Sequence, residues 1–279
     1  MWKPEHRRAA DRTGLRYPSD LSDAEWLIVE PMIPPAKRGG RRRSVNVREV
    51  LNGIFYVLWT GCQWKALPKD LPPKSTVHDY LELWNWDGTL QRIHHELYMA
   101  VREQEGREPS PTVAHYRLAD SQRLAKRGAW LDPSGYDAGK KIKGRKRHIL
   151  VDTLGLLLNV IVHPADVQDR DGALHLLRRA RRLFPFIELI FADGGYAGPK
   201  MALTVWRTGV WRLQIVKRSD TAGFEVLPKR WIVERTFAWI SRNRRLARDF
   251  ERYASTVAAF VRLAMIRIML RRLAANHSS

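Results

Sequence analysis

The sequence predicts an α/β protein in which a small all-helical domain precedes a mixed sheet flanked by helices. Three observations lead to this fold class. Up to about residue 105, apolar side chains recur at helical spacings between breaks marked by proline. Residues 106–112, with Pro109 and Pro111, have the composition of a linker. Beyond them, short apolar runs alternate with helical patterns. We therefore expect one domain over residues 1–108 and another over residues 109–279.

The net charge of the chain limits the classes of partner that it is expected to bind. Its 279 residues include 49 Lys and Arg against 29 Asp and Glu, a formal net charge of +20. Such a field attracts nucleic-acid phosphates, and an anionic membrane surface is the competing partner. The membrane is disfavoured because the cations are spread along the chain, and Arg262 and Arg267 interrupt the most apolar C-terminal stretch. No secretory signal is visible, and the single cysteine, Cys62, fits a reducing cytoplasm.

Four helices are predicted in the first domain, and Ser22 and Glu25 have the spacing of a capping box at the start of the first one. Their expected bounds are Ser22 to Pro31, Val47 to about Trp59, Ser75 or Thr76 to Gly88, and about Leu90 to Glu105. Between the first two, residues 37–43 form a basic, glycine-containing loop that could contact phosphates. The bundle is interpreted as a helix-turn-helix-like DNA-binding domain, with a dimerisation module as the alternative.

The second domain alternates strands and helices. Its first half is expected to contain a weak strand from Val113 to Ala119, an irregular segment to Gly139 and a central hairpin. A helix from Asp169 or Asp171, a strand from Phe186 to Ala192, a helix from Pro199 to Thr208 and a strand from Trp211 to Val216 are expected to follow. The last two elements are expected to be helices, from Pro228 to about Arg248 and from Ser255 to Ala274.

The hairpin lies within residues 140–166 and is the centre of the predicted sheet. Its apolar runs, Ile149–Val151 and Leu156–Val162, flank a turn that begins at Asp152 and favour burial on both faces. The dense basic segment of residues 140–147 precedes the first run, so we expect it to extend from one end of the core, within reach of a polyanion. A solvated charge run is the alternative interpretation.

Two aspartates follow predicted strands. Asp193 comes directly after an apolar strand, and Gly194 and Gly195 allow close approach of a substrate. Asp120 ends the weaker strand. Because sites form at the carboxyl ends of parallel strands, the two carboxylates are candidate ligands of two Mg²⁺ ions about 4 Å apart. From the residues alone, a turn aspartate is the alternative for Asp193.

A third carboxylate, Glu234, lies at the margin of the apolar face of a predicted helix. Arg230 stands four residues before it, so an ordinary surface ion pair is the alternative to a metal ligand.

Three long motifs of the second domain resemble bacterial insertion-sequence transposases with an Asp-Asp-Glu triad, in the large branch usually numbered five. They are residues 135–172, residues 191–198 (FADGGYAG) and residues 229–252 (KRWIVERTFAWISRNRRLARDFER). In the first domain, residues 20–26, 51–68 and 75–84 are similar to the helical DNA-binding domain of that family. The resemblance therefore covers nearly the whole chain.

The resemblance implies a ribonuclease H-like catalytic domain that binds two Mg²⁺ or Mn²⁺ ions and cuts and rejoins DNA at the ends of an element. It makes Asp120, Asp193 and Glu234 the catalytic metal ligands. The partners implied are the terminal inverted repeats, target DNA and further copies of the chain, in a bacterial cytoplasm at the nucleoid. The expected DNA contacts are Arg41, Arg42, Arg43, Lys140, Lys141, Lys143, Arg145, Lys146, Arg147, Arg230, Arg242 and Arg245.

Two positions depart from the family pattern. Arg123 follows the first-aspartate motif where a small polar and then a basic residue are usual, and Ser241 stands where a lysine or arginine is frequent. An inactive, DNA-binding relative and a nuclease without strand transfer are therefore the alternative functions. Asp132, Asp137 and Asp152 compete with Asp120, but they have the surroundings of loop or turn residues.

Overall fold

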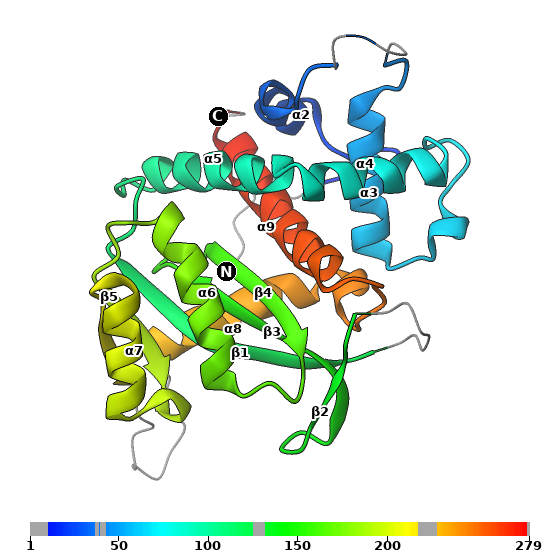
Figure 1. Ribbon diagram of the computed structural model, residues 1–279. Coiled ribbons are helices and arrows are strands. Elements are labelled where there is room, and N and C mark those ends of the chain that lie inside the picture. The colour runs from blue at the N-terminus through cyan, green and yellow to red at the C-terminus, as the bar shows by residue number, and fades with distance from the viewer. Residues whose placement is uncertain (1–10, 37–38, 40–42, 125–131, 217–227, 278–279) are drawn as a thin grey trace.

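The computed structural model describes residues 11–36, 39, 43–124, 132–216 and 228–277. Figure 1 shows a helical region formed by the N-terminal part of the chain next to a sheet with helices on its faces. Helix α9 (Ala254–His277) runs from the sheet into the helical region. The two regions share one continuous apolar core.

The sheet is mixed. Strand β1 (Val113–Arg123) is central, antiparallel to β3 (Ile142–Val151) and parallel to β5 (Leu189–Asp193). On one side β6 (Arg212–Val216) continues in parallel, and on the other β4 (Leu157–Pro164) and the short β2 (Gly135–Asp137) both pair with β3. This arrangement confirms the predicted α/β class and agrees with a ribonuclease H-like sheet.

Helices cover both faces of the sheet. Helix α6 (Asp169–Leu183) packs on β3 and β4 and contacts α7 (Pro199–Gly209), which covers β6. Helix α8 (Pro228–Ser241) packs against β1 on the opposite face, behind the sheet in Figure 1. The predicted helix to Arg248 is therefore too long, because the chain turns after Ser241 and forms only a short 3-10 helix at Arg244–Leu246.

The N-terminal helices are α2 (Asp23–Val29), α3 (Val47–Thr60), α4 (Lys74–Trp86) and α5 (Thr89–Gln104), with 3-10 turns at Glu30–Met32 and Trp64–Ala66. The capping box of Ser22 and Glu25 is confirmed, and Gly61 ends α3 in a left-handed conformation that favours glycine. The predicted cap of α4 is wrong. That helix begins at Lys74 after Pro73, without a side-chain cap.

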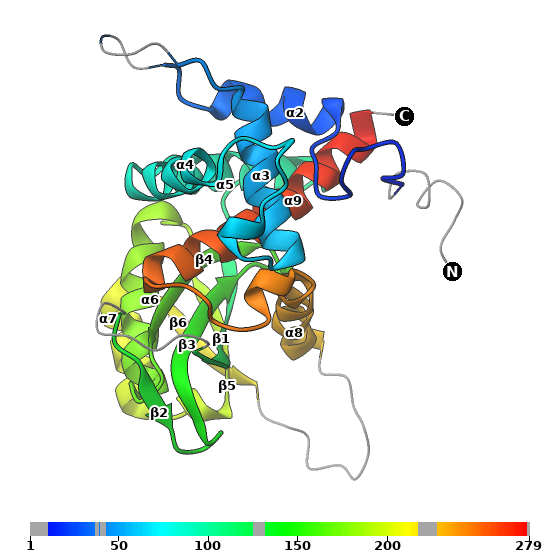
Figure 2. The ribbon, with the colours of Figure 1, turned by 90° about the vertical axis from the view of Figure 1, so that its right-hand side faces the viewer.

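Helix α9 is shared by both regions. It packs against α2, α3, α4 and α5, and also against β4 and α8 (Figure 2). Its Phe260 and Met265 are completely buried. Because a C-terminal helix closes the core of the N-terminal helices, the boundary at residue 108 stays a prediction and does not coincide with a break in packing.

Two sequence-based strand bounds are corrected. Strand β3 begins at Ile142, so most of the basic residues that were expected to extend from the core lie inside the strand, namely Lys143, Arg145, Lys146 and Arg147. Strand β1 does not end before Asp120 but continues to Arg123, because residues 121–123 pair with residues 144–146 of β3. Its register shifts between Leu118 and Ser121. Pairing between distant segments decided both bounds.

Within the described ranges, no helix has both the length and the apolar character needed to cross a bilayer.

Candidate active site

Asp193 is the last residue of β5 and lies at the carboxyl edge of the sheet. Its extended backbone lets it cap the short 3-10 helix Gly194–Tyr196, where its Oδ1 accepts a hydrogen bond from the Gly195 N–H at 3.0 Å. The residue is half-buried. A carboxylate held by a backbone bond and still open to solvent is suited to receive a cation or a substrate.

Asp120 lies in β1, the strand next to β5. Because β1 and β5 are parallel, the C-terminal part of β1 reaches the same edge of the sheet as Asp193. The position falls between the two registers in which β1 pairs with β3. The side chain of Asp120 lies outside the described part of the chain, and its role stays a prediction.

Glu234 is exposed on α8, the helix that packs against β1. The helix is fixed by the buried face of Val233, Thr236 and Ile240. The Thr236 hydroxyl also donates to the Gly155 carbonyl at 2.7 Å and ties α8 to the β3–β4 turn. The fold thus brings together the three elements that carry the predicted triad. The side chain of Arg230 lies outside the described part.

A buried polar pair lies on the sheet near Asp193, and the sequence interpretation missed it. The Tyr116 hydroxyl is 2.6 Å from Nδ1 of His148, and the Tyr196 ring meets Tyr116 edge-on at 4.8 Å. Burial raises the pKa of Tyr116 well above its usual value, with a further contribution from the nearby Tyr196. Burial, together with His163 and Lys146, lowers the pKa of His148 to about 2. The signal in the sequence that could have pointed to this aromatic cluster was Tyr196, which directly follows Gly194 and Gly195.

The aspartates that compete with Asp120 have structural partners. Asp152 is completely buried, and its carboxylate accepts from Arg102 at 2.6 Å, from Tyr98 and from the N–H groups of Leu154 and Leu156. Asp132 accepts from the N–H of Ala254 at 2.7 Å, at the start of α9. Asp137 is buried and accepts from the N–H of Lys140. Among the described residues, no three His, Cys, Asp or Glu side chains are grouped as a metal site.

The basic segment of residues 140–147 divides into two parts. Lys140, Lys141 and Lys143 are exposed. Arg145 is 1% exposed and forms a two-pronged ion pair with Asp249 at 2.6 and 2.7 Å. Lys146 bonds Asp169 at 3.0 Å, and Arg147 donates to the Leu246 carbonyl at 3.2 Å.

These internal bonds count against DNA contacts by the last three cations, and such contacts stay a prediction. Their side chains are buried and bonded within the protein, because β3 carries them into the sheet. The same holds for Arg245, which is buried and paired with Glu251 at 2.6 Å. Arg242 is exposed, and Arg43 donates to the Pro34 carbonyl. Arg41 and Arg42 lie outside the described residues.

Comparison with known proteins places these features in a family. A family model described as "Transposase DDE domain" matches residues 87–269, and one described as "Putative transposase of IS4/5 family" matches residues 21–94. A putative transposase for insertion sequence element IS402 of Burkholderia cepacia is 34% identical over 127 residues, which are 43% of this chain and 60% of that protein.

An uncharacterized 16.2 kDa protein of insertion element IS402, from the same organism, is 33% identical over 88 residues, which are 29% of this chain and 60% of that protein. The chain thus spans 60% of the length of each of these relatives. A crystal structure of a pre-cleavage Mos1 transpososome aligns over 88% of this chain and 83% of that chain, at 8% identity and a TM-score of 0.24. A likeness that distant supports no conclusion. The match of the DDE-domain model over more than half of the sequence shows that this chain belongs to the transposases with a DDE domain.

Proposed function

We propose that the protein is a DNA transposase that binds the ends of an insertion sequence and performs metal-dependent DNA cleavage and strand transfer. The main support is the position of Asp193 at the carboxyl end of β5, beside β1 and in a chain of the DDE family. This is the edge at which parallel strands present functional side chains. Asp120, Asp193 and Glu234 are the proposed catalytic residues.

The donor chemistry of these residues fits Mg²⁺ or Mn²⁺, because hard divalent cations prefer carboxylate oxygens. Asp193 is held in place by the Gly195 N–H, and its half-exposed position keeps it open to a ligand. Glu234 is exposed on a helix anchored through Thr236. The chemistry that two bound cations supply is activation of the attacking oxygen and stabilisation of the leaving oxygen.

The proposed partners are the terminal inverted repeats and target DNA, with a dimer or higher multimer assembled on them in the bacterial nucleoid. The cations proposed to contact DNA are the exposed ones, because Arg145, Lys146, Arg147 and Arg245 are buried. Lys140, Lys141 and Lys143 project from the β2–β3 end of the sheet, and Arg242 follows α8. A net charge of +20 adds long-range attraction to the DNA backbone.

The test uses purified protein and DNA that carries the ends of its own element. Asp193→Asn and Glu234→Gln should abolish Mg²⁺-dependent end cleavage and leave DNA binding intact, since loss of a carboxylate charge does not weaken attraction to phosphate. Glu188→Gln, at an exposed carboxylate near the opposite end of β5, is the matched control. Cutting at the wild-type rate by either active-site variant would refute the assignment.

The products separate the alternative functions. Joined DNA, in which an element end is linked to target DNA, identifies a transposase. Cut ends without joined product would indicate a nuclease. Specific binding without any metal-dependent cutting by the wild type would indicate an inactive relative, as the departures at Arg123 and Ser241 allow.

A further inference from the structure

The outer side of helices α6 and α7 carries a dense group of cations. The two helices pack side by side on one face of the sheet, and α8 packs on the other face (Figures 1 and 2). The Arg181 guanidinium donates to the Gly209 carbonyl at 3.2 Å and thereby joins the C-terminal ends of α6 and α7. The exposed cations of this outer side, with the one at the start of β6, are Arg178, Arg181, Arg182, Lys200, Arg207 and Arg212.

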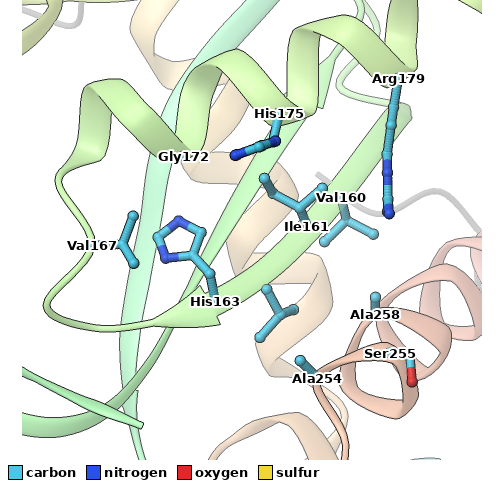
Figure 3. A pocket seen from close by; sticks show the side chains of 11 residues that line it. Val160, Ile161, His163, Val167, Gly172, His175, Arg179, Ala254, Ser255 and Ala258 are labelled. Atoms are coloured by element: carbon cyan, nitrogen blue, oxygen red, sulfur yellow. The ribbon is translucent and has the colours of Figure 1, made fainter. Parts of the chain in front are cut away.

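Arg179 is exposed as well, but it lies on another flank of α6. Figure 3 shows Arg179 and His175 on the flank next to β4 and α9, where both line a cavity of about 390 Å³. Arg181 is directed toward α7 instead, as its bond to Gly209 shows. The outer side of α6 therefore continues onto α7 and not onto α9.

The six outer cations differ from the buried ones in their partners. Within the ranges that the structure describes, no ion pair joins any of them to an aspartate or a glutamate. Residues 172–216 contain two carboxylates, Glu188 and Asp193, and Asp193 lies at the carboxyl edge of the sheet. Arg145, in contrast, is neutralised inside the protein by Asp249. The positive field of the outer side therefore extends into solvent, where it attracts a polyanion.

Large apolar side chains are exposed among these cations. Trp206 and Val210 lie four residues apart on the outer side of α7, and the Trp206 indole is 54% exposed. Phe186, in the turn after α6, is 65% exposed. Phe186 and Val210 each precede a strand, and these strands, β5 and β6, are parallel neighbours, so both residues lie at the same edge of the sheet. Aromatic rings between cations are typical of surfaces that bind nucleic acid, because phosphates pair with the cations and bases stack on the rings.

We infer that the α6–α7 surface, which consists of the six outer cations with Phe186 and Trp206, binds a second segment of DNA. The inference rests on the proposed function, because a transposase handles target DNA in addition to the end of its element. It gives the second segment a place on the protein. The planar donors of arginine match phosphate oxygens, and the aromatic rings pack against sugars and unstacked bases.

This place is distinct from the proposed active site. Glu234 lies on α8, and Asp193 lies at the carboxyl edge of the sheet. Phe186 and Val210 lie at the opposite edge, and α6 and α7 cover the face opposite to α8. Because the sheet separates the two places, a straight duplex that contacts Glu234 does not reach Trp206.

DNA suits this surface better than a second copy of the chain or a membrane does. In a two-fold contact the surface would meet itself, so that arginines would face arginines. A membrane surface favours one amphipathic helix that lies in the interface, whereas these cations are spread over two helices and the start of a strand.

The first test measures affinity for a duplex of random sequence against salt in EDTA, where no cleavage takes place. The triple variant Arg178→Gln, Arg182→Gln, Arg207→Gln keeps the bond between Arg181 and Gly209. It should lower the slope of log affinity against log salt by about two to three, roughly one per lost phosphate contact. Lysine at the same three positions keeps the charge and should retain the slope. A wild-type slope of the glutamine triple would overturn the inference.

An aromatic variant separates stacking from charge in the same assay. Trp206→Ala should weaken binding about fivefold or more and leave the salt slope unchanged, because an aromatic contact neutralises no phosphate. Trp86→Ala is the matched control, at an indole on α4 that is more exposed and stands beside Asp87. It should change neither quantity. Wild-type affinity of Trp206→Ala would remove the aromatic ring from the surface.

The second test asks whether the surface holds a segment of its own. The protein is saturated in EDTA with a labelled duplex that carries the element ends, and capture of a differently labelled random duplex is then measured. The glutamine triple should weaken capture of the second duplex about tenfold or more and change affinity for the first by less than about twofold. Equal weakening of both would indicate a general loss of charge and refute a separate segment.

The other occupants are distinguished by two measurements without DNA. Sedimentation should give the same oligomeric state for the wild type and the glutamine triple, and a different state would assign the surface to a second copy. Vesicles of phosphatidylserine and phosphatidylcholine should bind both proteins alike. Vesicle binding that the triple loses, with a wild-type salt slope on DNA, would assign the surface to a membrane.

The two proposals fail separately. Asp193→Asn should keep the wild-type salt slope in EDTA, whatever its cleavage activity. A failed catalytic assignment therefore leaves this inference standing, and unchanged slopes of the glutamine triple leave the catalytic assignment standing.

Discussion

Asp152 and Asp193 occupy similar places in the sequence and different places in the protein. Each follows an apolar strand and precedes a glycine-containing turn. Asp152 is completely buried and surrounded by donors from Arg102, Tyr98 and two backbone N–H groups. Asp193 is half-buried and has one backbone donor at the open edge of the sheet. A saturated carboxylate holds the fold together, and an open one is available for chemistry.

The same contrast divides the basic segment of β3. Arg145 and Lys143 are two residues apart, but one is paired with Asp249 in the interior and the other is exposed. Charge density in a sequence therefore does not identify a DNA contact. An internal partner, such as Asp249 for Arg145, identifies a cation that serves the fold.

The largest expected effect breaks this contrast at Arg145. Arg145→Ala leaves Asp249 buried without its partner and should lower the free energy of unfolding by about 3–5 kcal/mol. Lys143→Ala should change it by about 0.5 kcal/mol or less. Urea unfolding of both variants provides the measurement. Equal losses would show that Arg145 is not the structural member of the segment.

A second, smaller effect is expected at Asp152. Asp152→Asn keeps an oxygen for the N–H groups of Leu154 and Leu156 but loses the charged bond to Arg102, which joins α5 to the β3–β4 turn. The free energy of unfolding should fall by about 1.5–3 kcal/mol. Asp193→Asn serves as the comparison and should be close to neutral, since its carboxylate is half-exposed. A neutral Asp152→Asn would contradict the role assigned to the ion pair.

Much of the fold could be predicted from local patterns. The apolar spacing and Gly61 define α3, and the apolar run before Asp193 predicts β5 to within a few residues. The start of β3 could not be predicted, because Arg145 is stabilised by Asp249, which lies 104 residues away. The packing of α9 between the N-terminal helices and β4 is equally non-local.

The candidate site follows the same rule. Asp193 could be selected as a candidate because an apolar strand leads to it. Glu234 could be selected because it lies on an amphipathic helix. Rejection of Asp152 as a metal ligand rests on Arg102 and Tyr98, more than 40 residues away in the chain. Tyr116 and His148 were missed because their partnership forms only when β1 pairs with β3.

A pH-dependent effect is expected from two buried histidines. Burial lowers the pKa of His94 to about 3 and that of His148 to about 2. The unfolded chain takes up these protons near pH 6.5 and the folded protein does not. The free energy of unfolding is therefore highest above pH 6.5. It falls by about 1.4 kcal/mol per pH unit for each histidine as the pH decreases toward 3. Urea unfolding at pH 7 and pH 5 measures this loss.

A variant of one buried histidine tests this pH dependence directly. His148→Gln should reduce the loss of stability between pH 7 and pH 5, because a glutamine side chain takes up no proton when the chain unfolds. A wild-type protein equally stable at both pH values would show that these imidazoles do not titrate on unfolding.

Binding of Mn²⁺ tests most directly the claim that Asp193, and not Asp152, serves the metal site. Electron paramagnetic resonance of free Mn²⁺ during a titration reports the bound ion without any need for DNA or turnover. Wild type and correctly folded Asp152→Asn should bind Mn²⁺ alike, and Asp193→Asn should bind it at least tenfold more weakly, since an amide replaces a charged ligand. Undiminished binding by Asp193→Asn, or its loss in folded Asp152→Asn, would contradict the account.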